Sequence, residues 1–325
     1  MTGDTTKTDL LDLDIKGYEA LMVRLGHKPF HGRNLFKWIH KHGVTDFDAM
    51  TDLSKALRTE LADKTYLGLP RLALTEPSDD GTTKWVMELM DGQRIETVLI
   101  PETNRTTLCV SSQVGCALDC AFCATAQQGF SRNLTAGEII AQVWHATRQL
   151  GIAPRNIVMM GMGEPLANFD AVVRAMGVMQ DDLAYMVSKL RLTVSTSGVV
   201  PNIYRLREHS NVSLAVSLHA PDNALRDQLV PINLKYPLEQ LLPACRDYTG
   251  KDKHRKITWE YVMLDGVNDS LSHAKALIRL LEGTPSKINL IPFNPFPGSD
   301  FRTTPPERIE AFRQRLMRSG LFAMT

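Results

Sequence analysis

Three cysteines within eight residues are the strongest chemical signal in the sequence. Cys116, Cys120 and Cys123 follow the spacing C-x3-C-x2-C. Thiolates bind zinc and iron–sulfur clusters, and three of them would leave one iron of a [4Fe–4S] cluster open to a small ligand. The amino and carboxylate groups of S-adenosylmethionine can chelate such an iron, and electron transfer into its sulfonium yields a carbon radical. The spacing therefore favours an iron–sulfur centre that uses S-adenosylmethionine.

A structural zinc site is the alternative for the same cysteines. Cys109 would then be the fourth ligand. Zinc ligands usually come as two close pairs, which this spacing does not provide, so the zinc site is the weaker interpretation. The fifth cysteine, Cys245, lies among the hydrophobic positions of a predicted helix and is expected to be a core residue.

The elements that must position the cysteines follow an alternating pattern of strands and helices after Pro101. This alternation predicts a parallel sheet with helices outside it. Six units are too few for the eight of a closed barrel, so we expect an α/β fold built on a partial (β/α)6 barrel, with an open doubly wound sheet as the competitor. The expected strands are Thr107–Ser111, Asn156–Gly161, Arg191–Thr196, Val212–Leu218, Ile257–Met263 and Lys287–Pro292. The expected helices include Thr135–Leu150, Leu238–Tyr248, Ser270–Leu281 and Pro306–Ser319.

The first hundred residues have a different character. Hydrophobic residues recur at helical spacing between Asp14 and Lys64. From Leu67 to Pro101 the period changes towards two, with Asp-Gly turns that predict short hairpins. We therefore expect three parts: a helical accessory domain at 1–66, a small antiparallel β unit at 67–101 and the barrel at 102–325.

Small polar residues fall at most of the predicted strand ends. In a parallel barrel, chemistry takes place at the carboxyl ends of the strands. Glycines there allow close backbone approach, and Glu164 can accept hydrogen bonds from an ammonium group. Such a set suits a ligand with ribose hydroxyls and an amino-acid tail, although serine, asparagine and glycine are also common in loops. The residues are Gly161–Pro165, Ser195–Gly198, Ser217–His219, Asp265, Asn268 and Asn294–Phe296.

These motifs together resemble the RlmN/Cfr family of radical S-adenosylmethionine enzymes, which methylate adenine in RNA. The resemblance covers essentially the whole chain. It implies a radical S-adenosylmethionine barrel and, more closely, methylation of adenine C2 in 23S rRNA and in some tRNAs; C8 methylation of the Cfr type is the nearest alternative. The matching segments are Arg94–Pro101, Cys109–Phe130, Gly161–Leu166, Ser195–Pro201, Ser217–Pro221 and Ile288–Gly298.

The resemblance also implies a role for particular residues. Cys116, Cys120 and Cys123 would hold the [4Fe–4S] cluster. Glu96 would accept the substrate proton, and Cys109 would form a transient disulfide at the end of turnover. The residues that would contact S-adenosylmethionine are Gly163, Glu164, Ser195, Ser217, Leu218, His219 and Asn294.

In the family mechanism, one S-adenosylmethionine methylates a carboxyl-terminal cysteine. A second is cleaved to the 5′-deoxyadenosyl radical, which activates that methyl group for addition to adenine. The resemblance places the methyl-carrying cysteine on a tail beyond Thr325. We therefore expect residues 1–325 to bind the cluster and S-adenosylmethionine without transferring a methyl group.

A basic segment in the accessory region points to RNA. No acidic residue occurs between Glu19 and Asp46, whereas cations, histidines and aromatic residues alternate there. Such a face can bind phosphates and stack on unpaired bases, although it could equally be a solvated helix surface with its aromatics in the core. The segment contains Arg24, His27, Lys28, Phe30, His31, Arg33, Phe36, Lys37, Trp38, His40, Lys41 and His42. A second basic run, Lys251–Lys256, is expected to be a loop.

The composition is that of an ordinary globular protein. The chain has 325 residues, 43% hydrophobic and 22% charged, with a formal net charge of +1, so no global basic field indicates nucleic acid. The amino terminus lacks the apolar region of a secretory signal, and no apolar run is long enough to span a membrane. We expect a cytoplasmic monomer that receives electrons from a donor such as flavodoxin. Two further alternatives are an activase that installs a glycyl radical on a protein and a zinc-stabilised RNA-binding protein without catalysis.

Overall fold

The computed structural model describes residues 7–103, 105–250 and 255–325, and the chain divides into two compact units. The amino-terminal residues that bear on a secretory signal, and most of the basic run Lys251–Lys256, lie outside the described residues. Unit 1 comprises Met1–Val114, Ser131–Gly163 and Asn168–Leu192. Unit 2 comprises Gly115–Phe130, Glu164–Ala167 and Thr193–Thr325.

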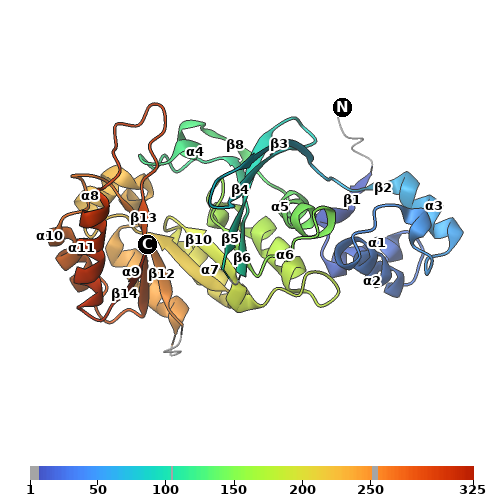
Figure 1. Cartoon of the computed structure of the whole chain (residues 1–325). Coiled ribbons are helices and arrows are strands. Elements are labelled where there is room, and N and C mark those ends of the chain that lie inside the picture. The colour runs from blue at the N-terminus through green and yellow to red at the C-terminus, as the bar shows by residue number, and fades with distance from the viewer. Residues whose placement is uncertain (1–6, 104, 251–254) are drawn as a thin grey trace. The chain divides into compact units, whose positions relative to one another are not determined.

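Unit 1 begins with the expected helices. Figure 1 shows α1 (Ile15–Arg24), α2 (Phe30–Phe36) and α3 (Lys55–Lys64) gathered beside a short parallel pair, β1 (Thr8–Asp9) and β2 (Thr65–Tyr66). Asp14 caps α1 by accepting from the Gly17 amide, and Ser54 caps α3 by accepting from the Leu57 amide. A π-helical turn at Lys37–Lys41 extends α2.

The strands of unit 1 are β3 (Arg71–Pro77), β4 (Thr83–Glu88), β5 (Arg94–Glu102), β6 (Arg105–Cys109) and β9 (Asn156–Met159). The strands from β3 to β6 are antiparallel in chain order, and β9 pairs with β6 in parallel. The helices are α5 (Ala136–Trp144), which a second π-helical turn at His145–Gln149 extends, and α6 (Phe169–Gln180). Thr135 and Glu138 form a capping box at the start of α5.

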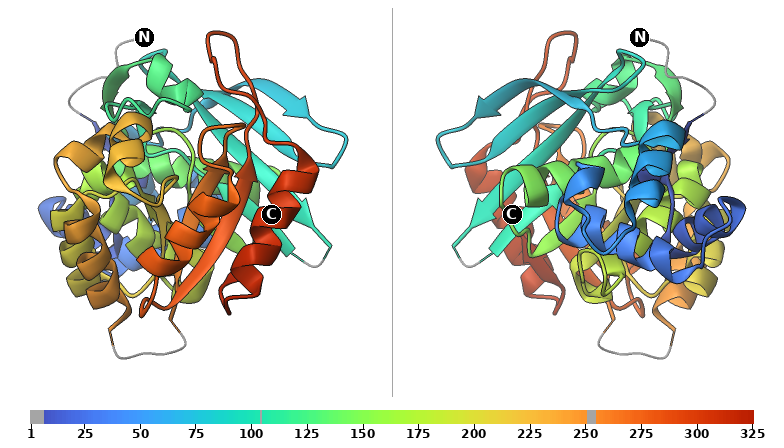
Figure 2. Two further views of the ribbon diagram at one scale, coloured as in Figure 1. Left: turned by 90° about the vertical axis from the view of Figure 1, so that its left-hand side faces the viewer. Right: turned by 90° about the vertical axis from the view of Figure 1, so that its right-hand side faces the viewer.

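Unit 2 is a run of parallel strands connected by helices. Its strands are β10 (Leu192–Thr196), β11 (Ser213–Ser217), β12 (Ile257–Met263), β13 (Ser286–Pro292) and β14 (Phe322–Met324), each paired with the next. All seven residues of β12 are buried. The helices are α7 (Val200–His209), α8 (Asn223–Leu229), α9 (Leu238–Thr249), α10 (Leu271–Leu280) and α11 (Pro306–Met317). The later helices, gold to red in Figure 2, stand beside the strands.

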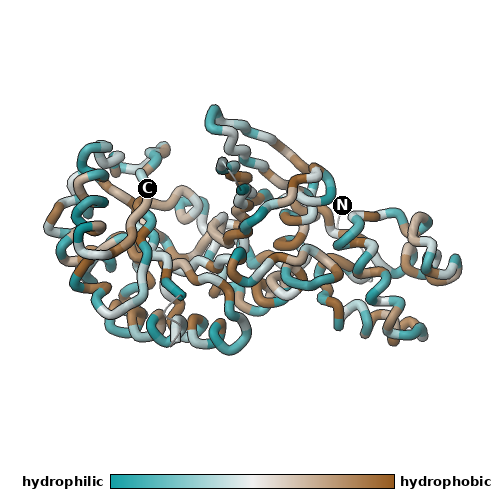
Figure 3. The backbone as a smooth tube through the Cα atoms, turned by 60° about the horizontal axis from the view of Figure 1, so that its bottom comes forward, coloured by the Kyte–Doolittle hydropathy of each residue, from teal (hydrophilic) through white to brown (hydrophobic). Residues whose placement is uncertain are grey.

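The cysteine segment has small elements of its own. The strands β7 (Gln113–Gly115) and β8 (Phe130–Asn133) form a two-stranded sheet, and α4 (Ala124–Gln127) lies between them in the chain. Hydrophobic and hydrophilic stretches alternate along the helices (Figure 3), as expected for helices that bury one face. Across the described residues, no helix is long and apolar enough to cross a membrane.

Candidate iron–sulfur and S-adenosylmethionine site

The cysteine loop in unit 2 is closed by backbone hydrogen bonds. The Cys116 amide donates to the Gly129 carbonyl at 3.0 Å, and the Cys123 amide donates to the Cys120 carbonyl at 3.0 Å. Gly115 has a φ of +74°, and a Cβ placed there would lie 1.8 Å from the Gly129 oxygen. Only glycine therefore fits where the chain enters the loop.

Hydrophobic packing fixes the middle of the loop against α8. The Ala121 amide donates to the Leu229 carbonyl at 3.1 Å, and Cys120 and Phe122 pack on the core cluster that contains Leu229. The Phe122 ring meets the His219 ring edge to face, with centroids 4.4 Å apart. The aromatic residue before the third cysteine is thus a packing anchor.

The thiol groups influence one another. Burial, together with the nearby Cys123 and Cys116, raises the pKa of Cys120 to about 12, while a hydrogen bond from Ser197 opposes the shift. Burial also raises the pKa of Cys116. Thiolates so disfavoured need a cationic partner, which the iron of a cluster supplies.

The donor set fits a cluster better than a single ion. Within 7–103, 105–250 and 255–325, no three His, Cys, Asp or Glu side chains are grouped so as to hold one metal ion. In a [4Fe–4S] cluster each cysteine binds a different iron, so its ligands need not converge on one point.

Glu164 is a buried carboxylate in the same unit. Its Oε1 accepts from the Leu166 amide at 3.0 Å and its Oε2 from the Ser197 amide at 2.7 Å. Burial raises the pKa of Glu164 to about 7 despite these bonds. The carboxylate therefore fixes the loop after β10, and a bound ammonium group would stabilise its charged form.

His219 stands at a tight bend after β11. Its φ is +60°, its Nδ1 accepts from the Val262 amide at 3.0 Å, and burial lowers its pKa to about 3. The imidazole is therefore neutral at physiological pH and acts as a hydrogen-bonding and packing group. The Asn268 side chain donates to the His219 carbonyl at 2.9 Å and so supports the bend.

The remaining expected ligand contacts of unit 2 differ in exposure. Ser195 in β10 and Ser217 at the end of β11 are half-buried, Leu218 is buried, and Asn294 after β13 is exposed. Ser217 is in register with Glu260 of β12. Unit 2 thus contains the three cluster cysteines and every expected S-adenosylmethionine contact except Gly163.

Unit 1 carries Glu96, Cys109 and Gly163. Glu96 on β5 is 42% exposed and its carboxylate lies 3.2 Å from the Lys84 ammonium group. Burial raises the pKa of Cys109 to about 12, so it is a thiol at neutral pH. Gly163 has a φ of +99°, and a Cβ there would lie 2.5 Å from Cβ of Gln113. A side chain at position 163 is therefore excluded.

Two buried polar residues on helices carry no signal in the sequence motifs. Gln142 on α5 accepts from the Thr97 hydroxyl at 2.7 Å and the Ser111 amide at 2.8 Å, so it braces the strand of Glu96 against the end of β6. Arg226 on α8 is fully buried. Both were missed because polar residues on helices are usually exposed, and only the helix phase could have indicated them.

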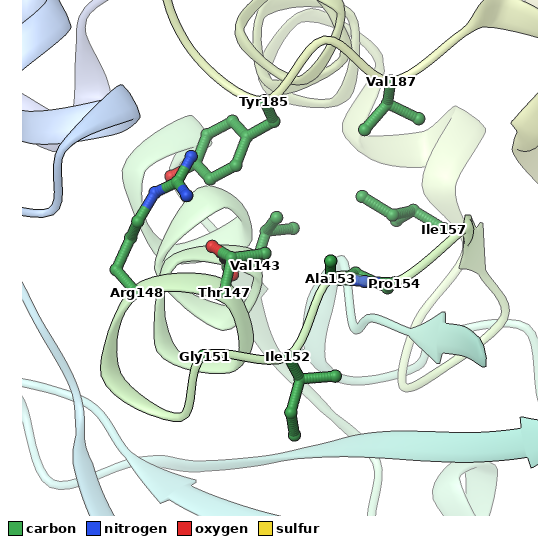
Figure 4. A pocket seen from close by; sticks show the side chains of 10 residues that line it. All are labelled: Val143, Thr147, Arg148, Gly151, Ile152, Ala153, Pro154, Ile157, Tyr185 and Val187. Carbon is green, nitrogen blue, oxygen red and sulfur yellow. Dashed lines mark hydrogen bonds between the residues drawn. The ribbon is translucent and has the colours of Figure 1, made fainter. Parts of the chain in front are cut away.

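A separate pocket in unit 1 has a volume of about 250 Å³ (Figure 4). Val143, Ile157 and Val187 contribute apolar walls, and the Arg148 guanidinium lies over the Tyr185 ring, 5.1 Å from its centroid. None of the site residues expected from the sequence lines this pocket.

The basic segment of the accessory region divides between surface and core. Phe36 and His40 are fully buried, and burial lowers the pKa of His40 to about 3. Phe30 is 49% exposed, and the Trp38 indole donates to Asp52 at 2.5 Å. The cations Arg24, Lys28, Arg33, Lys37 and Lys41 are exposed.

Comparisons with known proteins agree with this arrangement. Residues 110–279 match the radical SAM superfamily, and residues 8–67 match the ribosomal RNA large subunit methyltransferase N-terminal domain. A radical SAM methyltransferase from Sphaerobacter thermophilus has a similar structure, with a TM-score of 0.92, 45% identity and coverage of 98% of this chain and 94% of that one. The fold and the cysteine loop thus define a radical S-adenosylmethionine enzyme, and the expected α/β radical S-adenosylmethionine fold is confirmed.

Curated relatives identify the family. The chain is 57% identical over 320 residues to the dual-specificity RNA methyltransferase RlmN of Alkalilimnicola ehrlichii, with coverage of 98% of this chain and 89% of that protein. It is 54% identical over 316 residues to the protein of the same name from Halorhodospira halophila, with coverage of 97% and 88%. The chain belongs to the RlmN family. Its cofactors are accordingly a [4Fe–4S] cluster and S-adenosylmethionine, as predicted.

Proposed function

We propose that this protein methylates C2 of adenine in ribosomal RNA and transfer RNA by radical chemistry, and that residues 1–325 provide the cluster ligands, the S-adenosylmethionine contacts, the proton acceptor and the disulfide cysteine. The observation that carries the proposal is the cysteine loop in unit 2, whose entry requires glycine at position 115. The RlmN relatives at 52–57% identity over nearly the full chain support it. Adenine C2 is electron-poor, and a cluster-bound S-adenosylmethionine supplies the radical chemistry that polar methyl transfer could not provide there.

The residues of unit 2 bind and orient the cofactors in this proposal. Cys116, Cys120 and Cys123 hold the cluster. Glu164 accepts from the ammonium group of S-adenosylmethionine, and its burial strengthens that interaction. Neutral His219 keeps the turn after β11 in place. The other contacts are Gly163, Ser195, Ser217, Leu218 and Asn294, of which Gly163 belongs to unit 1.

Two residues of unit 1 have chemical roles in this proposal: one accepts a proton and the other forms a disulfide. The Glu96 carboxylate accepts the proton that leaves adenine C2, with Lys84 fixing its position. The Cys109 thiol closes the transient disulfide at the end of turnover. Gln142 supports both, because it bonds Thr97 beside Glu96 and Ser111 close to Cys109.

Exposed cations just before α2 and in its π-helical turn are the proposed RNA contacts. Lys28, Lys37 and Lys41 are exposed, whereas Phe36 and His40 hold the module together. The double variant K37E/K41E should weaken the binding of rRNA fragments and of tRNA by similar factors. It should also reduce the salt dependence of binding by about 0.7–0.9 for each phosphate that the variant no longer neutralises. Lys55→Glu on α3 is the matched control, and unchanged affinity in K37E/K41E would exclude this surface.

The finer assignments belong to the same proposal. We place the domain boundaries at 1–66, 67–101 and 102–325. We also propose a cytoplasmic monomer that receives electrons from a flavodoxin-like donor. Sedimentation of the purified chain, with and without an RNA fragment, tests the oligomeric state.

The decisive experiment is nucleoside mass spectrometry of rRNA and tRNA from cells with and without the gene. Loss of 2-methyladenosine from both RNAs on deletion is expected. Loss of 8-methyladenosine instead would assign the chain a C8 activity. No change in either nucleoside would overturn the RNA-methyltransferase proposal.

A further inference from the structure

Arg226 is a buried cation whose hydrogen bonds all go to neutral acceptors. It lies on α8 and has no exposed surface. Its Nε donates to the Leu218 carbonyl at 3.1 Å, and its Nη2 donates to the carbonyls of Ser197 at 2.7 Å and Ser217 at 2.9 Å. Its Nη1 donates to Oδ1 of Asn233 at 2.7 Å. One guanidinium therefore fixes the backbone just after β10 and at the end of β11.

The charge of Arg226 is not required by these bonds. Carbonyl oxygens also accept hydrogen bonds from a neutral amide, whereas burying a cation without a carboxylate in ion-pair contact is unfavourable. Among the described residues, no carboxylate forms an ion pair with Arg226, and the carboxylate of the adjacent Asp227 accepts at 2.6 Å from the Asn233 side-chain amide instead. Burial lowers the pKa of Arg226 to about 10, so the side chain remains cationic at neutral pH.

The cysteine loop would place negative charge beside the helix of Arg226 once its thiols are ionised. Burial lowers the pKa of Arg226, and the negative charge that Cys120, Cys245 and Asp227 carry when ionised opposes this shift. The loop is bonded to the helix of Arg226 through the Ala121 amide and the Leu229 carbonyl, 3.1 Å apart. Ser197, whose carbonyl binds Arg226, also donates through its side chain to Cys120.

We propose that Arg226 is a positioning residue for both cofactors: its donors hold the β10 and β11 ends in the conformation that receives S-adenosylmethionine, and its charge offsets the negative charge of the cluster thiolates. The proposal rests on the assignment of Cys116, Cys120 and Cys123 as cluster ligands. A nearby fixed positive charge favours the reduced, more negative cluster, so it raises the reduction potential.

The test compares charge with hydrogen bonding at position 226. Wild type, Arg226→Gln, Arg226→Lys and the control Arg246→Gln are purified anaerobically and reconstituted with iron and sulfide. Arg246 lies on α9, is exposed and bonds Thr284 at 2.8 Å. The readouts are iron content, the midpoint potential of the cluster from a redox titration followed by electron paramagnetic resonance, and the Kd for S-adenosylmethionine from calorimetry.

We expect R226Q to shift the midpoint potential to more negative values and to raise the Kd at least ten-fold. R226K should keep the wild-type potential, because the charge remains, while raising the Kd several-fold, because the planar fork of donors is lost. R246Q should change neither quantity. A wild-type potential in R226Q, or an equal negative shift in R226K, would overturn the proposal.

Poor folding of the neutral variant does not remove the test. If R226Q retains no iron, R226K decides the question alone. Iron bound at the wild-type potential in R226K supports the charge role. Loss of iron from R226K as well would assign Arg226 to packing and overturn the proposal. A wild-type chain that binds no iron would instead contradict the cluster site itself, and the inference would fall with it. Wild-type iron and S-adenosylmethionine binding with an unaffected R226Q would contradict only the inference.

Discussion

The surroundings of the five cysteines separate them into groups at the scale of single residues. Cys116, Cys120 and Cys123 share one loop in unit 2, Cys109 lies in β6 of unit 1, and Cys245 is fully buried in α9. The hydrophobic positions of the predicted helix around Cys245 place it in the core from sequence alone. No such pattern assigns Cys109, because a buried strand cysteine and a reactive one look alike in sequence.

Alanine substitution of the loop cysteines should abolish the cluster. We expect each of C116A, C120A and C123A to lose most bound iron, because three thiolates are the minimum set for the site. C245A and C109A should retain it, at a cost in stability for C245A from the cavity left in α9. Iron and sulfide analysis of anaerobically purified protein provides the measurement. Loss of metal from C109A would instead support the zinc alternative, in which Cys109 is the fourth ligand.

Glu96 and Glu76 offer a matched pair, because both carboxylates contact Lys84, at 3.2 Å and 2.7 Å. E96Q should lower methylation at least about 100-fold, the usual contribution of a positioned base, while S-adenosylmethionine binding stays unchanged. E76Q should have little effect. Complementation of a deletion strain with each gene, followed by nucleoside mass spectrometry, measures both. Normal 2-methyladenosine with E96Q would exclude Glu96 as the proton acceptor.

At the scale of elements, the sequence predicts the strands of the sheet well because their hydrophobic runs are continuous. The expected Ile257–Met263 coincides with β12, and the other barrel strands agree to within about two residues at most ends. The contacts that join the elements were not predictable. Gln142 and Arg226 bond backbone atoms far away in sequence, and such partners become apparent only after the chain has folded.

Gly115 and Gly129 test how the loop is closed. Both have a positive φ, +74° and +72°, but a Cβ at Gly129 meets nothing within 4 Å, whereas one at Gly115 meets the Gly129 oxygen at 1.8 Å. Each alanine carries the backbone cost of about 1–2 kcal/mol. G115A adds a steric clash, so it should destabilise the protein more and lose iron, while G129A keeps it. Denaturant unfolding and iron analysis compare the two variants. Equal stability and equal iron content in G115A and G129A would contradict the steric role of Gly115.

At the scale of the whole molecule, buried histidines make stability depend on pH. His40 is fully buried between the hydroxyls of Tyr18 and Tyr185, and burial lowers its pKa to about 3. An unfolded histidine titrates near 6.5, so between these values the unfolded state binds more protons than the folded state. Stability therefore falls as the pH decreases through this window. Asp9, with a pKa raised to about 6, acts in the opposite direction.

A variant isolates the contribution of His40. From pH 7 to pH 5, the wild type should lose up to about 2 kcal/mol more unfolding free energy than H40Q, which cannot titrate. Denaturant unfolding at both pH values gives the comparison. Parallel losses in the two proteins would show that His40 becomes protonated in the folded state.

The basic segment shows where prediction from sequence ends at this scale. Its cations and aromatics are evident, but only the fold shows that Phe36 and His40 face inward and Phe30 outward. The π-helical turn departs from the α-helical period, so helical spacing alone does not give the orientation of His40 within it.

Side chains at the second π-helical turn donate hydrogen bonds to backbone carbonyls of the first. The Trp144 indole donates to the Ile39 carbonyl at 3.2 Å, and Arg148 donates to the His40 carbonyl at 2.6 Å. Each turn holds one residue more than an α-helical turn, and deleting that residue would rotate the rest of the helix by about 100°. Such a deletion in either turn would separate donor from acceptor. In evolutionary terms, the lengths of these two turns are coupled, and lineages of this family should gain or lose the extra residues together.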